Sequence, residues 1–162
     1  MIKNVKIPEE RIGVIKSCIK DLGNKTKAKV VVEDKKVKIE GEPLDVWKTK
    51  DIVKAIGRGF SPQKAFRLLN DESILYVINL KEYQNTEKGL KRIKGRLIGR
   101  EGKTREKIEE ISDSIISVYG KTVSIIAYSE KISFVREAIE MLINGSKHNK
   151  VYNFLYRCFD DR

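Results

Sequence analysis

Two glycines three residues apart, Gly99 and Gly102, form the part of this sequence best suited to binding chemistry. They lie in the segment Arg-Leu-Ile-Gly-Arg-Glu-Gly-Lys-Thr-Arg, residues 96–105. Glycine lets the backbone turn sharply and has no Cβ to obstruct an approaching sugar-phosphate chain. A helix that begins after Gly102 would direct its free N–H groups and the positive end of its dipole at the same phosphates. The segment therefore predicts a loop that contacts phosphate.

Basic residues are dense around this loop. From Lys88 to Lys107, nine lysines and arginines stand against two glutamates, a local net charge of +7. The whole chain of 162 residues has 34 basic and 23 acidic residues and a net charge of +11. Each basic side chain placed on a phosphate releases condensed counterions, so this surplus favours a polyanionic partner. A solvated basic surface, or the Lys-rich composition of a thermophile, would produce the same surplus.

The candidate nucleic-acid-binding residues are contiguous or nearly so. They are Arg96, Ile98, Gly99, Arg100, Glu101, Gly102, Lys103, Thr104 and Arg105. Arg100, Lys103 and Arg105 are the best candidates for phosphate contact. Glu101 would repel phosphate unless it points to solvent or reads a base amino group. For bases we expect an apolar groove beside the loop, with Ile98, Ile116 and Val118 as candidates for its wall; plain core packing explains each of these equally well.

Two enzymatic interpretations of these residues fail. Gly102-Lys103-Thr104 ends like a nucleotide-binding P-loop, but that motif requires a glycine where Leu97 stands and a preceding strand rather than a helix. His148 is the single histidine, and Cys18 and Cys158 are too few and too distant for a disulfide framework or a zinc cluster. We therefore expect no enzyme, no cofactor and no metal site.

The elements that must position the loop follow from hydrophobic periodicity. In the second half of the chain the order is strand, helix, helix, strand, strand, helix, with these expected bounds: 75–80, 87–98, 103–112, 115–118, 122–128 and 130–143. In the first half, we expect strands at 2–7, 28–32 and 36–40 and helices at 9–22, 45–56 and 62–69, with Asp45 as a helix cap. The order of strand, helical segment, two strands and helix repeats, with a single helix at 9–22 in place of the two at 87–98 and 103–112, so the chain reads as two copies of one unit.

The first copy is shorter at the position of the loop. The first strands of the two copies begin 73 residues apart, whereas the corresponding elements after the second helix begin about 85 to 87 residues apart. Gly13 corresponds to Gly99, but Lys16 stands where the second glycine would be. We expect the loop to be lost there, the helix to run through, and Cys18 to be a small buried residue. A repeat without its loop is expected to serve as a protein-contact surface.

Strand, helix, Ile-Gly-x-x-Gly, helix, two strands and a helix is the KH arrangement, whose loop clamps about four nucleotides of backbone. The fold class predicted is α+β, with two tandem type I KH domains (βααββα) of which the first lacks its GxxG loop. The expected domains are residues 1–70, residues 71–145 and a C-terminal extension, 146–162. The extension carries an apolar stripe, which favours a terminal helix packed on the KH core; an RNA- or partner-contacting role is the alternative.

The whole chain resembles the archaeal members of the Dim-two, or partner-of-Nob-one, family of KH-domain ribosome-assembly proteins. The resemblance rests on residues 55–62 (Ala-Ile-Gly-Arg-Gly-Phe-Ser-Pro), on residues 94–104, and on Ile-Asn-Gly-Ser at 143–146 leading into Lys-Val-Tyr at 150–152. One departure is the incomplete first loop, because some archaeal relatives keep more of it.

The resemblance implies a protein that binds single-stranded small-subunit precursor rRNA near its 3′ end and assists the endonuclease that makes the mature end. We expect no apolar signal region or membrane span and a cytoplasmic location. Two other classes remain open: a KH adaptor in translation or RNA decay, and a protein-interaction module without RNA specificity.

Overall fold

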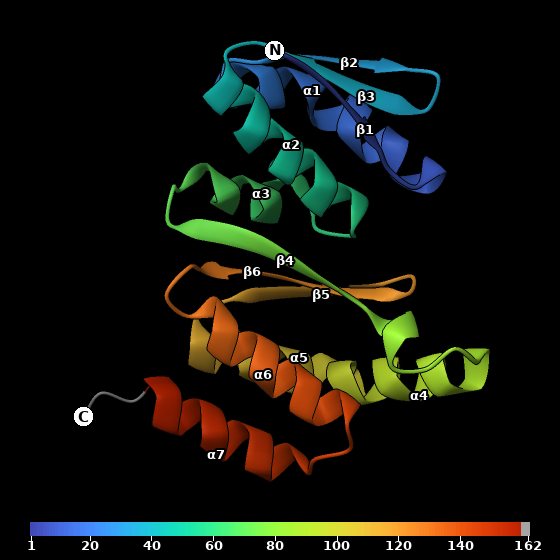
Figure 1. Ribbon diagram of the computed structural model, residues 1–162, viewed down its shortest axis with the longest axis vertical. Helices are drawn as coiled ribbons and strands as arrows, with labels where there is room; N and C mark the ends of the chain where they lie inside the picture. The colour runs from blue at the N-terminus through green and yellow to red at the C-terminus, as the bar shows by residue number, and fades with distance from the viewer. Residues whose placement is uncertain (160–162) are drawn as a thin grey trace. The chain divides into compact units, whose positions relative to one another are not determined.

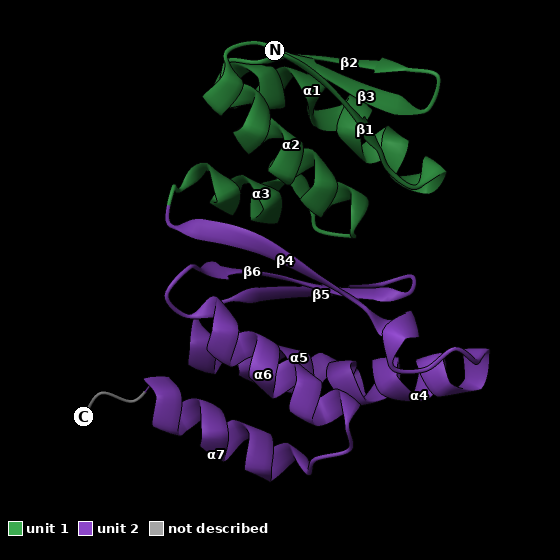
Figure 2. Cartoon of the chain, viewed as in Figure 1, with its two compact units in different colours: residues 1–71 green, residues 72–162 purple. Residues whose placement is uncertain are grey.

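The computed structural model describes residues 1–159, which form two compact units. The first unit is Met1–Asp71 and the second begins at Glu72 (Figure 2). The second unit includes the C-terminal helix, so residues 146–159 belong with it rather than apart from it. No helix in the described part of the chain is long and apolar enough to cross a membrane.

The second unit is a three-stranded antiparallel sheet covered by helices (Figure 1). Its strands stand in the order β4-β6-β5, so β5 is an edge strand. In chain order the elements are β4 (Ser73–Asn79), the short η3 (Leu80–Glu82), α4 (Glu87–Ile98), η4 (Arg100–Gly102), α5 (Lys103–Ser112), β5 (Ile115–Tyr119), β6 (Thr122–Tyr128), α6 (Ile132–Ile143) and α7 (His148–Phe159). The expected bounds of α4 and α5 are confirmed.

The core of this unit lies between the sheet and the helices. Val123, Ile125 and Ala127 alternate along β6 and point to the helical side, where they are fully buried. The helices contribute residues at helical spacing to the same cluster: Leu90, Ile93, Leu97, Ile108, Val135, Ile139 and Leu142. Because one continuous cluster joins α4 and α5 to the sheet, the break between these two helices is held at both ends.

The first unit repeats the sheet order, as β1-β3-β2. Its elements are β1 (Ile2–Lys6), η1 (Glu9–Arg11), α1 (Ile12–Thr26), β2 (Lys29–Glu33), β3 (Lys36–Glu40), α2 (Pro43–Gly57), α3 (Pro62–Ala65) and η2 (Phe66–Leu69). The expected cap at Asp45 is wrong. Helix α2 already begins at Pro43, whose fixed φ suits the first turn, and its N-cap Glu42 makes no side-chain cap bond.

Several local contacts occur in both units at equivalent positions. The hydroxyl of Thr26 donates to the carbonyl of Leu22, and that of Ser112 donates to the carbonyl of Ile108, each at 2.6 Å. The residue after each hydroxyl, Lys27 or Asp113, adopts a left-handed conformation, with φ of 65° and 50°. The ends of α1 and α5 are therefore built alike. The difference in length falls before them, where the three residues of η1 replace the twelve of α4.

Helix α7 is attached to the second unit by a narrow apolar stripe. Val151 and Leu155 are fully buried, and α7 packs against both α5 and α6. At its end, the ring of Phe159 meets that of Phe134 edge to face, with centroids 5.7 Å apart. The expected terminal helix packed on the core is thus present over His148–Phe159, and residues 160–162 lie outside the described residues.

We expect Leu155→Ala to lower the free energy of unfolding by about 3 kcal/mol, because the deletion leaves a cavity in the core of the second unit. Tyr156→Ala, one residue along and 47% exposed, is the matched control and should change it by less than about 1 kcal/mol. Urea titration followed by circular dichroism measures both. Similar values for the two variants would show that α7 adds little to the fold.

Candidate nucleic-acid interface

Helix α4 carries the loop and is fixed at both ends. At its start, the hydroxyl of Thr86 accepts a hydrogen bond from the N–H of Gly89 at 3.0 Å. Along its inner face Leu90, Ile93 and Leu97 enter the core. At its end, the N–H of Gly99 donates to the carbonyl of Gly95 at 2.8 Å. The loop that follows therefore leaves from a rigid helix.

The loop, residues 99–102, has three residues with positive φ. Gly99 has φ 75° and ψ 178°, Glu101 has φ 56° and ψ 27°, and Gly102 has φ 76° and ψ 9°. Gly102 is the N-cap of α5 and has no side chain to cap the first turn. The helix N–H groups that a capping side chain would otherwise occupy are thus left for a ligand such as phosphate.

The two glycines are required for different reasons. A Cβ at position 99 would lie 2.1 Å from Oγ1, 2.7 Å from Cβ and 2.8 Å from the backbone nitrogen of Thr104. At position 102 the nearest atom to such a Cβ would be 3.8 Å away, on the Arg105 side chain. Gly99 is therefore demanded by close packing and by its φ, and Gly102 by its φ alone.

The structure separates the predicted residues by exposure. Arg100, Glu101 and Lys103 are exposed around the loop. Thr104 is only 5% exposed, because it packs under Gly99. Ile98 is half-buried. Arg100 and Lys103 thus present exposed cationic ends, whereas Thr104 supports the loop by packing against Gly99.

Arg96, a predicted nucleic-acid contact, also has a structural role. Its Nε donates to the carbonyl of Leu142 at 2.9 Å and its Nη2 donates to the carbonyl of Ser146. These acceptors are the end of α6 and the connection to α7. Two of its five N–H donors thus hold α4 against α6, and contact of Arg96 with nucleic acid stays a prediction.

The first unit has the same arginine clamp. Nε of Arg11 donates to the carbonyl of Ile56 at 2.8 Å, and its Nη2 donates to that of Phe60 at 2.9 Å. Ile56 and Phe60 precede Leu142 and Ser146 by 86 residues each (142 − 56 and 146 − 60). The clamp is therefore a structural device that both units share. Repetition of the arginine in both halves was the sequence signal that could have shown this.

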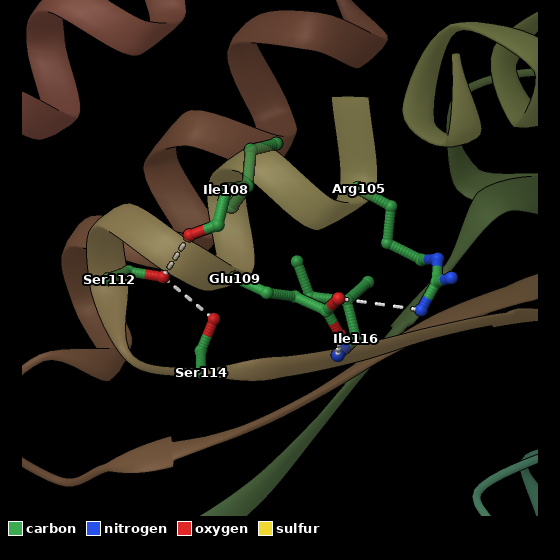
Figure 3. Close-up of polar contacts among 6 residues, drawn as sticks. All are labelled: Arg105, Ile108, Glu109, Ser112, Ser114 and Ile116. Carbon is green, nitrogen blue, oxygen red and sulfur yellow. Dashed lines mark hydrogen bonds and ion pairs between the residues drawn. The ribbon is translucent and has the colours of Figure 1, made fainter. Parts of the chain in front are cut away.

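Arg105 is held by Glu109, which lies one turn further along α5 (Figure 3). Its Nη1 lies 3.5 Å from Oε1 of Glu109, and Oε2 of Glu109 accepts the N–H of Ile116 on the edge strand at 2.8 Å. Both side chains are mostly buried, at 28% and 16% exposure. Glu109 consequently links the Arg105 guanidinium to the edge strand β5.

The predicted groove wall is only partly correct. Ile116 is 3% exposed and belongs to the core cluster, whereas Val118 is half-buried at the margin of that cluster. Sequence reasoning missed a pocket of about 310 Å³ between α4 and the β5–β6 turn. It is lined by Glu87, Leu90, Lys91, Lys94, Gly120 and Lys121. Gly120-Lys121, a basic residue at a tight turn, was the available signal.

At the equivalent place in the first unit the helix is continuous. Helix α1 runs from Ile12 to Thr26 without a left-handed residue, and a Cβ at Gly13 would meet no atom within 4 Å. Cys18 is 6% exposed, and burial raises the pKa of its thiol. Neither a turn nor a close approach requires the glycine there, so this segment presents an ordinary helix surface. No group of three or more metal-ligating side chains occurs among residues 1–159.

The family comparison decides the relationship. Residues 74–159 match the model of the second KH domain of PNO1, described as a eukaryotic type KH domain (KH-domain type I). A KH domain-containing protein of Methanocaldococcus jannaschii is 42% identical over 96% of the chain and 73% of its own length. This chain belongs to the PNO1 and Dim2 family of KH-domain proteins. The resemblance predicted from the sequence is confirmed, and so are the α+β class and the KH domain.

Other members of the PNO1 and Dim2 family extend the comparison. Dim2p of Pyrococcus horikoshii superposes with a TM-score of 0.91 at 44% identity, covering 97% of this chain and 99% of that one. The chain of a P. horikoshii a/eIF2alpha–aDim2p–rRNA complex that matches has a TM-score of 0.92 at 43% identity, covering 100% and 96%. The pre-rRNA-processing protein PNO1 of Chaetomium thermophilum is 33% identical over 78% of the chain. The chain spans 49% of that fungal protein's length.

Proposed function

We propose that this chain is a ribosome assembly factor that binds single-stranded small-subunit precursor rRNA near its 3′ end and assists 3′-end maturation. The observation that carries the proposal is the loop at residues 99–102, which places two exposed cations and the uncapped start of α5 on one surface. A KH loop of this kind clamps about four nucleotides. Support also comes from the family, whose members include pre-rRNA-processing proteins and an aDim2p in complex with rRNA.

We further propose that the two units are tandem type I KH domains, 1–70 and 71–145, of which the first has lost its loop. The shared sheet order and the repeated arginine clamp support this. A repeat that keeps the fold without the glycine pair retains a surface for protein contact. We assign residues 1–70 to that role, with the 3′-end processing endonuclease as the expected partner, and the chain itself to binding without catalysis.

An adaptor that joins RNA to a protein is the second candidate. One observation favours it: the P. horikoshii complex contains a/eIF2alpha together with aDim2p and rRNA. In that case, the RNA surface of the second unit would be the same and the co-purifying protein would differ. The two candidates therefore share their RNA chemistry and differ in partner.

The salt dependence and the RNA preference of binding test the proposal. Four phosphates held by the loop, each releasing about 0.7 counterion, give a log–log slope of affinity against salt of about −3. Fluorescence titration should show this slope on the 3′-terminal segment of small-subunit rRNA, with weaker binding to a duplex and to a scrambled strand. A flat salt response, tighter duplex binding, or equal affinity for the scrambled strand would contradict the proposal.

A further inference from the structure

The outer face of α7 is a basic surface separate from the loop. It consists of Lys147, Asn149, Lys150, Asn153, Tyr156 and Arg157, which line one shallow pocket. This α7 outer face lies on the opposite side of the helix from Val151 and Leu155, the residues that anchor α7 in the core. Folding of the second unit does not use the α7 outer face, because α7 packs on the core through Val151 and Leu155.

The charges on this face are unbalanced. Lys147, Lys150 and Arg157 are exposed, and none of them forms an ion pair with a carboxylate within residues 1–159. Helix α7 has no acidic residue in its described sequence, His148–Phe159. Lys150 and Arg157 on the helix, together with Lys147 directly before it, attract a polyanion.

The structure connects the start of α7 to the helix turn that precedes the loop. Arg96, in the last turn of α4, donates to the carbonyl of Ser146, and Nε2 of His148 lies 3.2 Å from the Arg96 carbonyl oxygen. Helix α7 therefore starts beside the helix turn that precedes Gly99. From there it packs along α5, where Nζ of Lys107 lies 4.8 Å from the ring centroid of Tyr152. A strand leaving the loop along α5 would reach α7 next.

We propose that the α7 outer face binds the single-stranded RNA that continues beyond the loop, so that the RNA site is longer than four nucleotides. The inference rests on the proposed function. Lysine and arginine supply phosphate contacts, while the amides of Asn149 and Asn153 carry both donors and acceptors for base edges. The ring of Tyr156, 47% exposed, offers a stacking surface. This mixture fits RNA better than an acidic peptide, which requires only cations.

The test compares two RNA lengths on the full chain. One RNA has about five nucleotides and fills the loop, and the other has about twelve, with the same sequence at its centre, enough to run along α7. The variant is Lys150→Gln with Arg157→Gln. Its matched control is Lys16→Gln with Lys20→Gln, which removes the same charge from exposed positions on α1 of the first unit.

We expect the wild type to bind the longer RNA more tightly than the shorter one. The α7 variant should lose about five- to tenfold in affinity for the longer RNA and little for the shorter, and its salt slope on the longer RNA should be shallower by about 1.4. The control should change both affinities by the same small factor.

Three results would overturn the inference: equal wild-type affinity for both lengths, an equal loss on both lengths, or no loss beyond that of the control. The last would show that the face takes no part in RNA binding. A failure of the proposed function is distinguishable, since then the wild type would bind neither RNA, or the loop variant Arg100→Asp with Glu101→Asp would still bind the shorter one.

Discussion

Single-stranded RNA binding should fall by about 100-fold or more when Arg100 and Glu101 are both replaced by aspartate, because like charge placed against phosphate costs several kcal/mol. Both residues are exposed in the loop, so neither change removes a core contact. Glu101 has φ 56°, a left-handed conformation that aspartate adopts more readily than glutamate. The fold should therefore survive, and an unchanged circular dichroism spectrum and melting temperature check that it does.

The matched control for this variant is Lys16→Asp with Ser17→Asp in α1. Both positions are exposed, and the control changes the net charge by −3 (−2 for the lysine and −1 for the serine), compared with −2 for the loop variant. If overall charge governed affinity, the control would weaken binding more. We expect the control to weaken binding far less, because α1 is a continuous helix without a GxxG loop to hold phosphates. Retained affinity in a folded loop variant would show that residues 99–102 are not the clamp.

The second large effect is on stability. Gly99→Ala should lower the free energy of unfolding by about 3 to 4 kcal/mol. Two costs combine: about 1–3 kcal/mol for an L-residue at φ 75° and ψ 178°, a backbone region that is essentially restricted to glycine, and about 1–3 kcal/mol for overpacking. The overpacking arises because the new Cβ would lie 2.7 Å from Cβ and 2.8 Å from the backbone nitrogen of Thr104. Rotation of the Thr104 side chain cannot relieve the contact with its backbone.

Gly102→Ala is the comparison, because its φ of 76° is also positive but its ψ of 9° lies in the milder left-handed α region and its surroundings are open to 3.8 Å. It should cost only the conformational part, about 1–2 kcal/mol. Urea unfolding followed by circular dichroism measures both. Fluorescence of Trp47, the single tryptophan, follows the unfolding of the first unit separately. Equal destabilisation by the two alanines would contradict the packing at Gly99.

Local patterns in the sequence were enough for much of the fold and for the location of the loop. Helical periodicity defines α4, and paired glycines between two helices define the turn, because these signals act within a few residues of one another. The shortened first unit also follows from the spacing of its elements, since the first strands lie 73 residues apart and the later elements about 85 to 87. Contacts between neighbours in sequence are what such patterns encode.

The roles of individual arginines and of Thr104 depended on tertiary structure. Arg96 lies among other cations in the sequence, and only the approach of the carbonyls of Leu142 and Ser146, 46 and 50 residues away, shows where its donors go. Arg105 likewise lies near Glu109 in sequence, but the bond from the Ile116 N–H to Glu109 sets its place beside β5. Charge and periodicity identify which residues are basic or buried. Which partner each one meets is decided by the packing of distant segments, and that packing separates the exposed Arg100 and Lys103 from the residues that support them.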